Sequence, residues 1–213
     1  MARLRSLPTA LATLDWHEAL NWQETAALQQ LIQQRFAQQH NAHIQHFLPR
    51  LFGLWQAEQP QAAVGLRFAN SEPLFLECYL DGQAEDILNQ RFQQSIARRD
   101  IAEIGNLASL RPGLLHQLFI CLARQLAAEG VAWLLFTATP EVANGLRRLG
   151  LEPQPISPAD PHRLGDQLHL WGHYYQHRPW VMAGDLRHAM HTLQTLPAFT
   201  EIASEEVLHA RLA

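Results

Sequence analysis

Apolar and polar positions follow a helical period in the first third of the chain. Between residues 22 and 39 the large apolar side chains recur at three- and four-residue intervals: Leu28, Leu31, Ile32 and Phe36. Asn21, followed three residues later by Glu24, has the spacing of a helix-capping pair. The pattern therefore predicts an amphipathic helix over residues 22–39, with its glutamine-rich side facing solvent.

Shorter apolar runs with turn residues between them come next. RLFGLWQ (50–56) and AAVGLRFAN (62–70) have strand-like composition, and Pro60 lies in the joint between them. Together they predict a β-hairpin. The run LFLECYL (74–80) is either a third strand or an apolar segment that leads into a helix over residues 85–98.

The second half of the chain alternates strand and helix patterns. The stretch 101–108 is strand-like, 114–129 places its leucines on one helical face, and 131–138 is a short apolar run typical of a buried strand. Thr139, followed by a proline and a glutamate, begins a further helix. Strands joined in this way by a helix form a parallel pair with a right-handed crossover.

The remainder of the chain is less regular. Prolines at positions 153, 155, 158 and 161 predict an irregular loop, and the stretch 169–186 predicts one or two strands before a polar tail helix. Because a hairpin precedes the parallel pair, we expect a mixed α/β class in a single domain.

Composition limits the classes of partner. The chain is 47% hydrophobic and 17% charged with a formal net charge of -4, which gives no general attraction to nucleic acid or anionic lipid. No apolar run approaches the roughly 20 residues that span a bilayer, so we expect no stable membrane insertion. The amino-terminal stretch resembles a signal peptide, but polar residues and Asp15 interrupt it, so we expect a cytoplasmic protein. Cys78 and Cys121 are expected to be buried, reduced thiols rather than a disulfide.

Polar residues interrupt the predicted strand EIGNLAS (103–109). A buried carboxylate or amide without a partner costs a few kcal/mol, so Glu103 and Asn106 need a reason to be there. A bulge at Gly105 would turn both side chains toward one opening at the carboxyl end of the strand, where open α/β sheets bind ligands. The following loop brings Arg111 to the amino end of the next helix, a place that suits an anion.

Histidines and aromatic residues gather near the carboxyl end. His169, His173 and His177 recur every four residues, but on a helix the outer two would lie about 12 Å apart, too far to share one zinc ion. We therefore expect surface histidines and no metal. A nearby aromatic cluster is either a membrane-contacting edge or, the interpretation we favour, core and subunit packing that makes a homodimer reasonable: Trp171, Tyr174, Tyr175 and Trp180.

Six segments together resemble the thermostable hemolysin family of Gram-negative bacteria: AAVGLRFA, LFLECYLD, IAEIGNLAS, WLLFTAT, LRRLGLEP and WGHYYQHRPWVMAG. The resemblance covers about residues 30–186. That family in turn resembles the Gcn5-related N-acetyltransferase (GNAT) fold and its acyl-homoserine lactone synthase branch. The resemblance implies a GNAT-like domain over residues 21–186. Its sheet would be mixed and mostly antiparallel, with a splayed parallel pair, and helices would flank it. Residues 1–20 would be an extension, and residues 187–213 a helical tail.

The resemblance also implies site residues. Arg67 matches the arginine on a strand of the lactone synthases, and Glu103 matches the glutamate of their pattern Glu-x-Ser-Arg-Phe. Gly105, Asn106 and Leu107 replace the last three residues of that pattern, so lactone synthesis itself is not implied. By the same resemblance, the acyl-carrier-binding loop would comprise Leu107, Ala108, Ser109, Arg111 and Gly113.

The fold's common tyrosine acid falls on Leu146 here. The resemblance implies transfer of an acyl group from an acyl-CoA or acyl carrier protein thioester to a small-molecule amine. Glu103 would be the general base, directly or through a water, and Asn106 would stabilise the oxyanion or position the acceptor. Arg67 would anchor a carboxylate or hold Glu103 in place, and the alternative is a merely structural Arg67–Glu103 salt bridge. Two other functions stay open: a directly membrane-active hemolysin, and a non-catalytic ligand-binding module.

Overall fold

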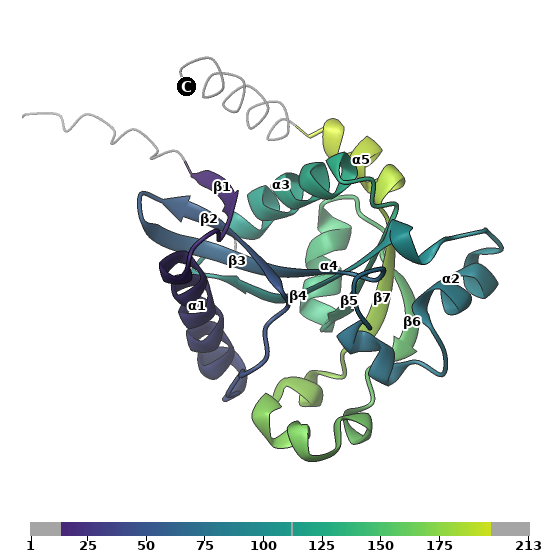
Figure 1. The fold of residues 1–213 in the computed structure, drawn as a ribbon, viewed down its shortest axis with the longest axis horizontal. Coiled ribbons are helices and arrows are strands. Elements are labelled where there is room, and N and C mark those ends of the chain that lie inside the picture. The colour runs from purple at the N-terminus through teal and green to yellow at the C-terminus, as the bar shows by residue number, and fades with distance from the viewer. Residues whose placement is uncertain (1–13, 112, 197–213) are drawn as a thin grey trace, which may run out of the picture.

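The computed structural model describes residues 14–111 and 113–196 (Figure 1). Most of the signal-like stretch and most of the predicted tail lie outside these residues. Seven strands form one sheet in the order β1-β2-β3-β4-β5-β7-β6, and every neighbouring pair is antiparallel except the parallel β4 and β5. The predicted mixed sheet with one parallel pair is confirmed.

The first helix forms where its apolar spacing predicts it. α1 spans Trp22–His40, the Asn21 side chain accepts a hydrogen bond from the Glu24 backbone N–H at 2.9 Å, and Leu28 and Ile32 are fully buried. Before it, β1 (Asp15–Glu18) pairs with β2, so part of the predicted amino-terminal extension is the edge strand of the sheet.

The predicted hairpin is present, and the segment after it follows the second of its two alternatives, an apolar segment that leads into a helix. β2 (Arg50–Gln56) and β3 (Gln59–Phe68) are antiparallel neighbours. The run 74–80 is not a strand: it contains the 3₁₀ helix η1 (Phe75–Tyr79). The helix predicted over residues 85–98 is α2 (Ala84–Phe92), which ends early because Gln93 adopts a left-handed conformation. A second short 3₁₀ turn, η2 (Arg98–Asp100), leads into β4.

The strand–helix–strand unit confirms the pattern of the second half. Its elements are β4 (Ile101–Ser109), α3 (Leu114–Ala128), β5 (Trp133–Ala138) and α4 (Pro140–Arg148). Gly130 and Gly150 have φ of 79° and 76°, so each supplies the left-handed turn after its helix.

The final third of the chain contains a strand where the prolines predicted an irregular loop. The proline-rich stretch includes β6 (Gln154–Pro158), an edge strand that pairs with β7 (Trp180–Asp185). Prolines are tolerated there because one side of an edge strand has no partner strand. The segment between these strands is helical rather than extended, with 3₁₀ helices η3 (Pro161–Trp171) and η4 (Tyr174–His177). α5 (Leu186–Gln194) follows β7.

Helices cover both faces of the sheet. α3, α4 and α5 pack on one face with a large apolar core that includes Ile104 and Phe136. On the other face α1 packs over the first strands, and η1, α2 and η3 pack over β5 and β7 (Figure 1). Both cysteines are free as predicted, but only Cys121 is buried; Cys78 is exposed. The three spaced histidines are exposed, as predicted.

Candidate functional site

The two parallel strands separate in the middle of the sheet. β4 and β5 pair from Ile101↔Trp133 to Ile104↔Phe136 and no further. β4 then continues along β3 to Ser109, whereas β5 continues along β7 to Ala138. A fork therefore opens beyond Ile104 and Phe136, with backbone on both sides that has no partner across the gap.

A bulge in β4 marks the start of this fork. Ala63 pairs with Ala108 and Gly65 pairs with Gly105, so Asn106 and Leu107 together oppose a single β3 residue. The predicted bulge is confirmed, but its position shifts by one residue. Gly105 pairs regularly, and Asn106 has the left-handed backbone, with φ of 51°. Asparagine enters this region more readily than most residues.

The glycines beside the bulge make room for the chain rather than for a ligand. A Cβ on Gly65 would lie 2.8 Å from the Asn106 Oδ1 and 2.9 Å from the Leu48 Cβ. A Cβ on Gly105 would lie 3.2 Å from the Leu48 Cδ1. The segment that joins α1 to β2 therefore packs directly onto the strands at the bulge.

Asn106 holds that segment in place. Its Oδ1 accepts a hydrogen bond from the Leu48 N–H at 2.8 Å, and its Nδ2 donates to the His46 carbonyl at 3.4 Å. Both ends of the amide are thus engaged with residues 46–48. In this arrangement the Asn106 amide, which we expected to stabilise an oxyanion or to position the acceptor, is directed to His46 and Leu48.

We expect Asn106→Ala to destabilise the protein by about 2–3 kcal/mol, because it leaves the Leu48 N–H unsatisfied and puts alanine at positive φ. Asn106→Gly loses the same hydrogen bond but adopts the backbone freely, so it should cost about 1 kcal/mol less. Urea unfolding of both variants checks this difference. Equal stability of the alanine and glycine variants would contradict the assigned strain.

Glu103 is buried beside the start of η1. Its side chain is 4% exposed, and its oxygens accept hydrogen bonds from the backbone N–H groups of Phe75 at 2.7 Å and Leu76 at 3.1 Å. Burial raises the pKa of this carboxyl to about 7, although the two N–H donors and the charge of Arg67 oppose the shift. Near neutral pH the Glu103 carboxyl is therefore partly protonated and partly ionised, but protein atoms cover it.

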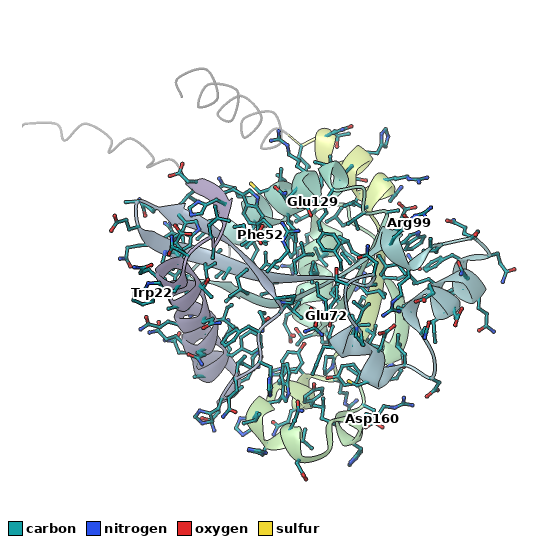
Figure 2. The ribbon with its side chains drawn as sticks, in the orientation of Figure 1. Trp22, Phe52, Glu72, Arg99, Glu129 and Asp160 are labelled. Carbon is teal, nitrogen blue, oxygen red and sulfur yellow. The ribbon has the colours of Figure 1, made fainter. Side chains whose placement is uncertain are left out.

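Arg67 is the cross-strand partner of Glu103, yet its guanidinium is directed elsewhere. It donates to the Pro73 carbonyl at 3.0 Å, and its ion pair is with Glu72 at 3.6 Å (Glu72 is labelled in Figure 2). The structural alternative of a direct Arg67–Glu103 salt bridge is therefore wrong. Arg67 acts on Glu103 through its charge, and its buried Nε has no hydrogen-bond partner.

The loop after β4 leads to an open helix terminus. The Ser109 hydroxyl donates to the Arg111 carbonyl at 2.5 Å and accepts from the Arg111 N–H at 3.2 Å, which curls the chain before α3. No side chain caps the first turn of α3, whose N-cap is Gly113. The Leu114 N–H donates to the Arg111 carbonyl at 3.1 Å, so the exposed Arg111 and the amino end of α3 lie together just beyond the fork, on the loop that contains the predicted carrier-binding residues.

An aromatic side chain from the segment before β7 contacts the end of β5 beside the fork. Tyr174 is buried, and its hydroxyl donates to the Thr137 carbonyl at 3.3 Å, one residue beyond the last parallel pair. This confirms core packing for Tyr174, whereas Trp180 is 42% exposed.

His40, the last residue of α1, lies against Tyr174 with ring centroids 5.2 Å apart. Its pKa is lowered by burial and by His177, and Glu141 opposes this shift. Sequence reasoning missed His40, because no local pattern links the end of α1 to a segment more than a hundred residues later.

A separate cavity lies on the face of the sheet that α3, α4 and α5 cover. It has a volume of about 320 Å³, and apolar side chains form most of its lining. Ile104 and Phe136, the last pair before the fork, both line it. The cavity therefore meets the sheet at the point where the two strands separate.

The fold is similar to that of several solved structures. The acyl-homoserine lactone synthase LasI has a TM-score of 0.57 at 11% identity, with 82% of this chain and 91% of that chain covered. FeeM, an N-acyl amino acid synthase from uncultured soil microbes, has a TM-score of 0.59 at 11% identity, covering 82% and 90%. An acyl-CoA N-acyltransferase from Pseudomonas aeruginosa has a TM-score of 0.50 at 15% identity, covering 81% and 99%.

These likenesses define the fold as GNAT-like. A search of curated proteins finds no match. The sequence model of the family described as Thermostable hemolysin matches residues 20–190, and the chain belongs to that family. The predicted family and fold are both confirmed.

Proposed function

We propose that the protein is an N-acyltransferase that moves an acyl group from a CoA or acyl carrier protein thioester to an amine. The fork between β4 and β5 is the observation that carries this proposal. An extended donor arm with amide groups can lie in the fork as an added strand and pair with the unpartnered backbone. The similar folds of LasI and FeeM support the proposal, since their names describe acyl transfer.

The loop after β4 would hold the charged end of the donor. The arm would pass the backbone of Leu107, Ala108 and Ser109, and its phosphates would lie at the amino end of α3, beside Gly113. Arg111 would add positive charge there. In a carrier protein the same contacts would bind the single phosphate at the base of the arm.

The transfer step forms a C–N bond and breaks the C–S bond of the thioester. The amine loses a proton, and the departing thiolate gains one, so the sum of reactants and products balances without an oxidant or metal. Because Glu103 is 4% exposed, we assign it to accept the proton through a water rather than by direct contact. Arg67 would keep that carboxyl ionised often enough to act, because its charge opposes the shift caused by burial.

A second function, non-catalytic ligand binding, is favoured by two observations. Backbone N–H groups engage both oxygens of Glu103, and Leu146 is buried in the apolar core at the position of the fold's common tyrosine acid. A binding module would retain the fork and use Glu103 only to hold η1.

A directly membrane-active hemolysin is the remaining alternative. Across residues 14–111 and 113–196, no helix has the length and apolar character to cross a bilayer. The cytoplasmic location, the carrier protein partner and the homodimer remain proposals.

Incubation of the purified protein with acyl-CoA donors and a panel of primary amines, followed by mass spectrometry, tests the proposal. We expect amide products and, without amine, thermal stabilisation by the donor that corresponds to about 2.7 kcal/mol at a hundred times its Kd. Arg111→Ala should weaken this stabilisation, and Arg178→Ala, an exposed arginine on another segment, should not. Stabilisation without turnover would select the binding module, and the absence of both would refute the donor site.

A further inference from the structure

One side-chain hydroxyl lies at the fork itself. The Leu186 N–H donates to the Ala132 carbonyl at 2.9 Å, so that carbonyl is directed toward the β7 side of β5. Carbonyls of successive strand residues point to alternate sides, so the Thr137 carbonyl is directed toward β4. At this point β4 no longer pairs with β5. The Tyr174 hydroxyl, which donates to the Thr137 carbonyl at 3.3 Å, therefore lies in the fork.

The ring of Tyr174 is fixed by its neighbours. It is buried, and its centroid lies 5.2 Å from those of His40 and Tyr175 and 5.5 Å from that of Trp171. The His173 N–H also donates to the His40 carbonyl at 2.6 Å, which ties the backbone beside Tyr174 to the end of α1. The hydroxyl is thus held in place before a ligand arrives.

Burial keeps this hydroxyl protonated. It raises the pKa of Tyr174 well above its usual value, and the neighbouring Tyr175 adds to the shift. The group therefore donates a hydrogen bond throughout the neutral range of pH. Its bond to the Thr137 carbonyl, at 3.3 Å, is longer than the about 2.7–2.8 Å that is usual for a hydroxyl donor, so it is easily exchanged for another.

The reaction needs a hydrogen-bond donor in the fork that Asn106 does not supply. Attack on a thioester places negative charge on the carbonyl oxygen, and preorganised donors stabilise that charge. The Asn106 amide, which we expected in this role, is directed to His46 and Leu48. Glu103 is covered by protein atoms, and its oxygens accept hydrogen bonds from backbone N–H groups.

We propose that the Tyr174 hydroxyl donates a hydrogen bond to the thioester carbonyl oxygen and stabilises the oxyanion during transfer. An amide N–H of the donor arm, lying in the fork as an added strand, would take over the Thr137 carbonyl and release the hydroxyl to turn toward the thioester. The proton stays on the Tyr174 oxygen throughout, so the balance of the transfer step is unchanged. The inference rests on the proposed acyltransferase function and adds a catalytic residue from the segment before β7.

Tyr174→Phe tests the assignment, because it keeps the ring and removes the hydroxyl. We expect kcat to fall by about a hundredfold to a thousandfold, the usual loss for one oxyanion donor, while the Kd of the acyl-CoA donor measured by calorimetry stays the same. The rise of kcat/KM with pH toward about 7 should persist, since Glu103 is unchanged. A wild-type kcat in this variant would overturn the inference.

Tyr175→Phe is the matched control. The Tyr175 hydroxyl shares a hydrogen bond with that of Tyr79 on η1 rather than with the backbone of the fork. Its removal should lower the free energy of unfolding and leave the kcat of the folded protein unchanged. If both variants lose kcat in proportion to their stability, Tyr174 acts only through packing and the inference is wrong.

Infrared difference spectroscopy gives a readout that needs no turnover. The probe is acetyl-CoA with an isotope label at the thioester carbonyl. Its carbonyl stretch should lie at a lower frequency when bound to the wild type than when bound to Tyr174→Phe, because a hydrogen bond to the oxygen weakens the C=O bond. Equal frequencies in the two proteins would contradict the contact.

The outcomes separate the two proposals. A frequency difference between wild type and Tyr174→Phe without any amide product would support the hydroxyl contact and refute the enzyme. Amide products made at the same rate by both proteins would support the enzyme and refute the role of Tyr174.

Discussion

Glu103→Gln is expected to lower kcat/KM for acyl transfer by about a hundredfold to ten-thousandfold, the range over which general bases contribute. Glutamine has nearly the same shape, so it keeps one hydrogen bond to η1 but cannot take up the proton of the amine. Steady-state kinetics with a single donor and amine measures the loss. A variant that folds and transfers at the wild-type rate would leave Glu103 with a purely structural role.

Glu77→Gln is the matched structural control for this substitution. Glu77 also accepts backbone hydrogen bonds at this turn, from Leu74 and Ala84 at 2.9 Å each, but it belongs to η1 rather than to the fork. It should lower the free energy of unfolding without lowering the transfer rate of the folded protein. If the two variants lose activity in proportion to stability, Glu103 acts only by holding η1.

The pH dependence separates the roles further. Because the pKa of Glu103 is raised to about 7, kcat/KM should rise with pH up to about 7 and then level off. The effect on stability has the opposite direction. The folded state holds the proton more tightly than the unfolded chain, so this contribution is complete below pH 4.5 and is lost as pH rises through about 7. Glu103→Gln should abolish both dependences.

Gly172→Ala is expected to destabilise the protein by more than about 3 kcal/mol, because it combines backbone strain with a backbone clash. Gly172 has φ of 50° and ψ of -119°, a conformation that suits only glycine. A Cβ there would lie 2.2 Å from the His40 carbonyl oxygen. The close approach is structural, since the His173 N–H donates to that same oxygen at 2.6 Å. Thermal or urea unfolding measures the cost.

Gly165→Ala separates strain from clash. Gly165 has a similar backbone, with φ of 55° and ψ of -129°, but a Cβ there would have no atom within 4 Å. It should cost only the strain, about 1–3 kcal/mol. The excess cost at Gly172 then reports how firmly the segment before Tyr174 is fixed to the end of α1. Equal costs at the two glycines would show that the segment yields without penalty.

Apolar periodicity and capping residues were sufficient to predict the elements whose packing partners are close in sequence. The helix of 22–39, the hairpin, and the strand–helix–strand unit of 101–138 each match the observed elements to within a few residues. Their periodicity and their caps, Asn21 and Thr139, are properties of short segments. The resemblance of six segments to the thermostable hemolysin family predicted the family and the fold.

Local pattern failed where the conformation depends on distant partners. The prolines of 154–158 indicated a loop, but β7 offers a free edge that accepts them as a strand. The apolar run 74–80 suited either a strand or a segment that leads into a helix, and the choice depends on the Glu103 carboxylate, 28 residues after Phe75, which accepts hydrogen bonds from N–H groups at the start of a 3₁₀ turn. In both cases a tertiary contact outweighed propensity.

The site shows the same division. The sequence by itself determined that Glu103, a glycine and Asn106 interrupt an apolar strand before a helix, and that such an interruption needs a bulge. Only the tertiary structure decided where each group is directed: Glu103 to η1, Asn106 to residues 46–48, and the cavity to the far side of Ile104 and Phe136. The reason is physical, because spacing along a strand fixes which face a side chain takes, whereas its partner depends on which segment packs there.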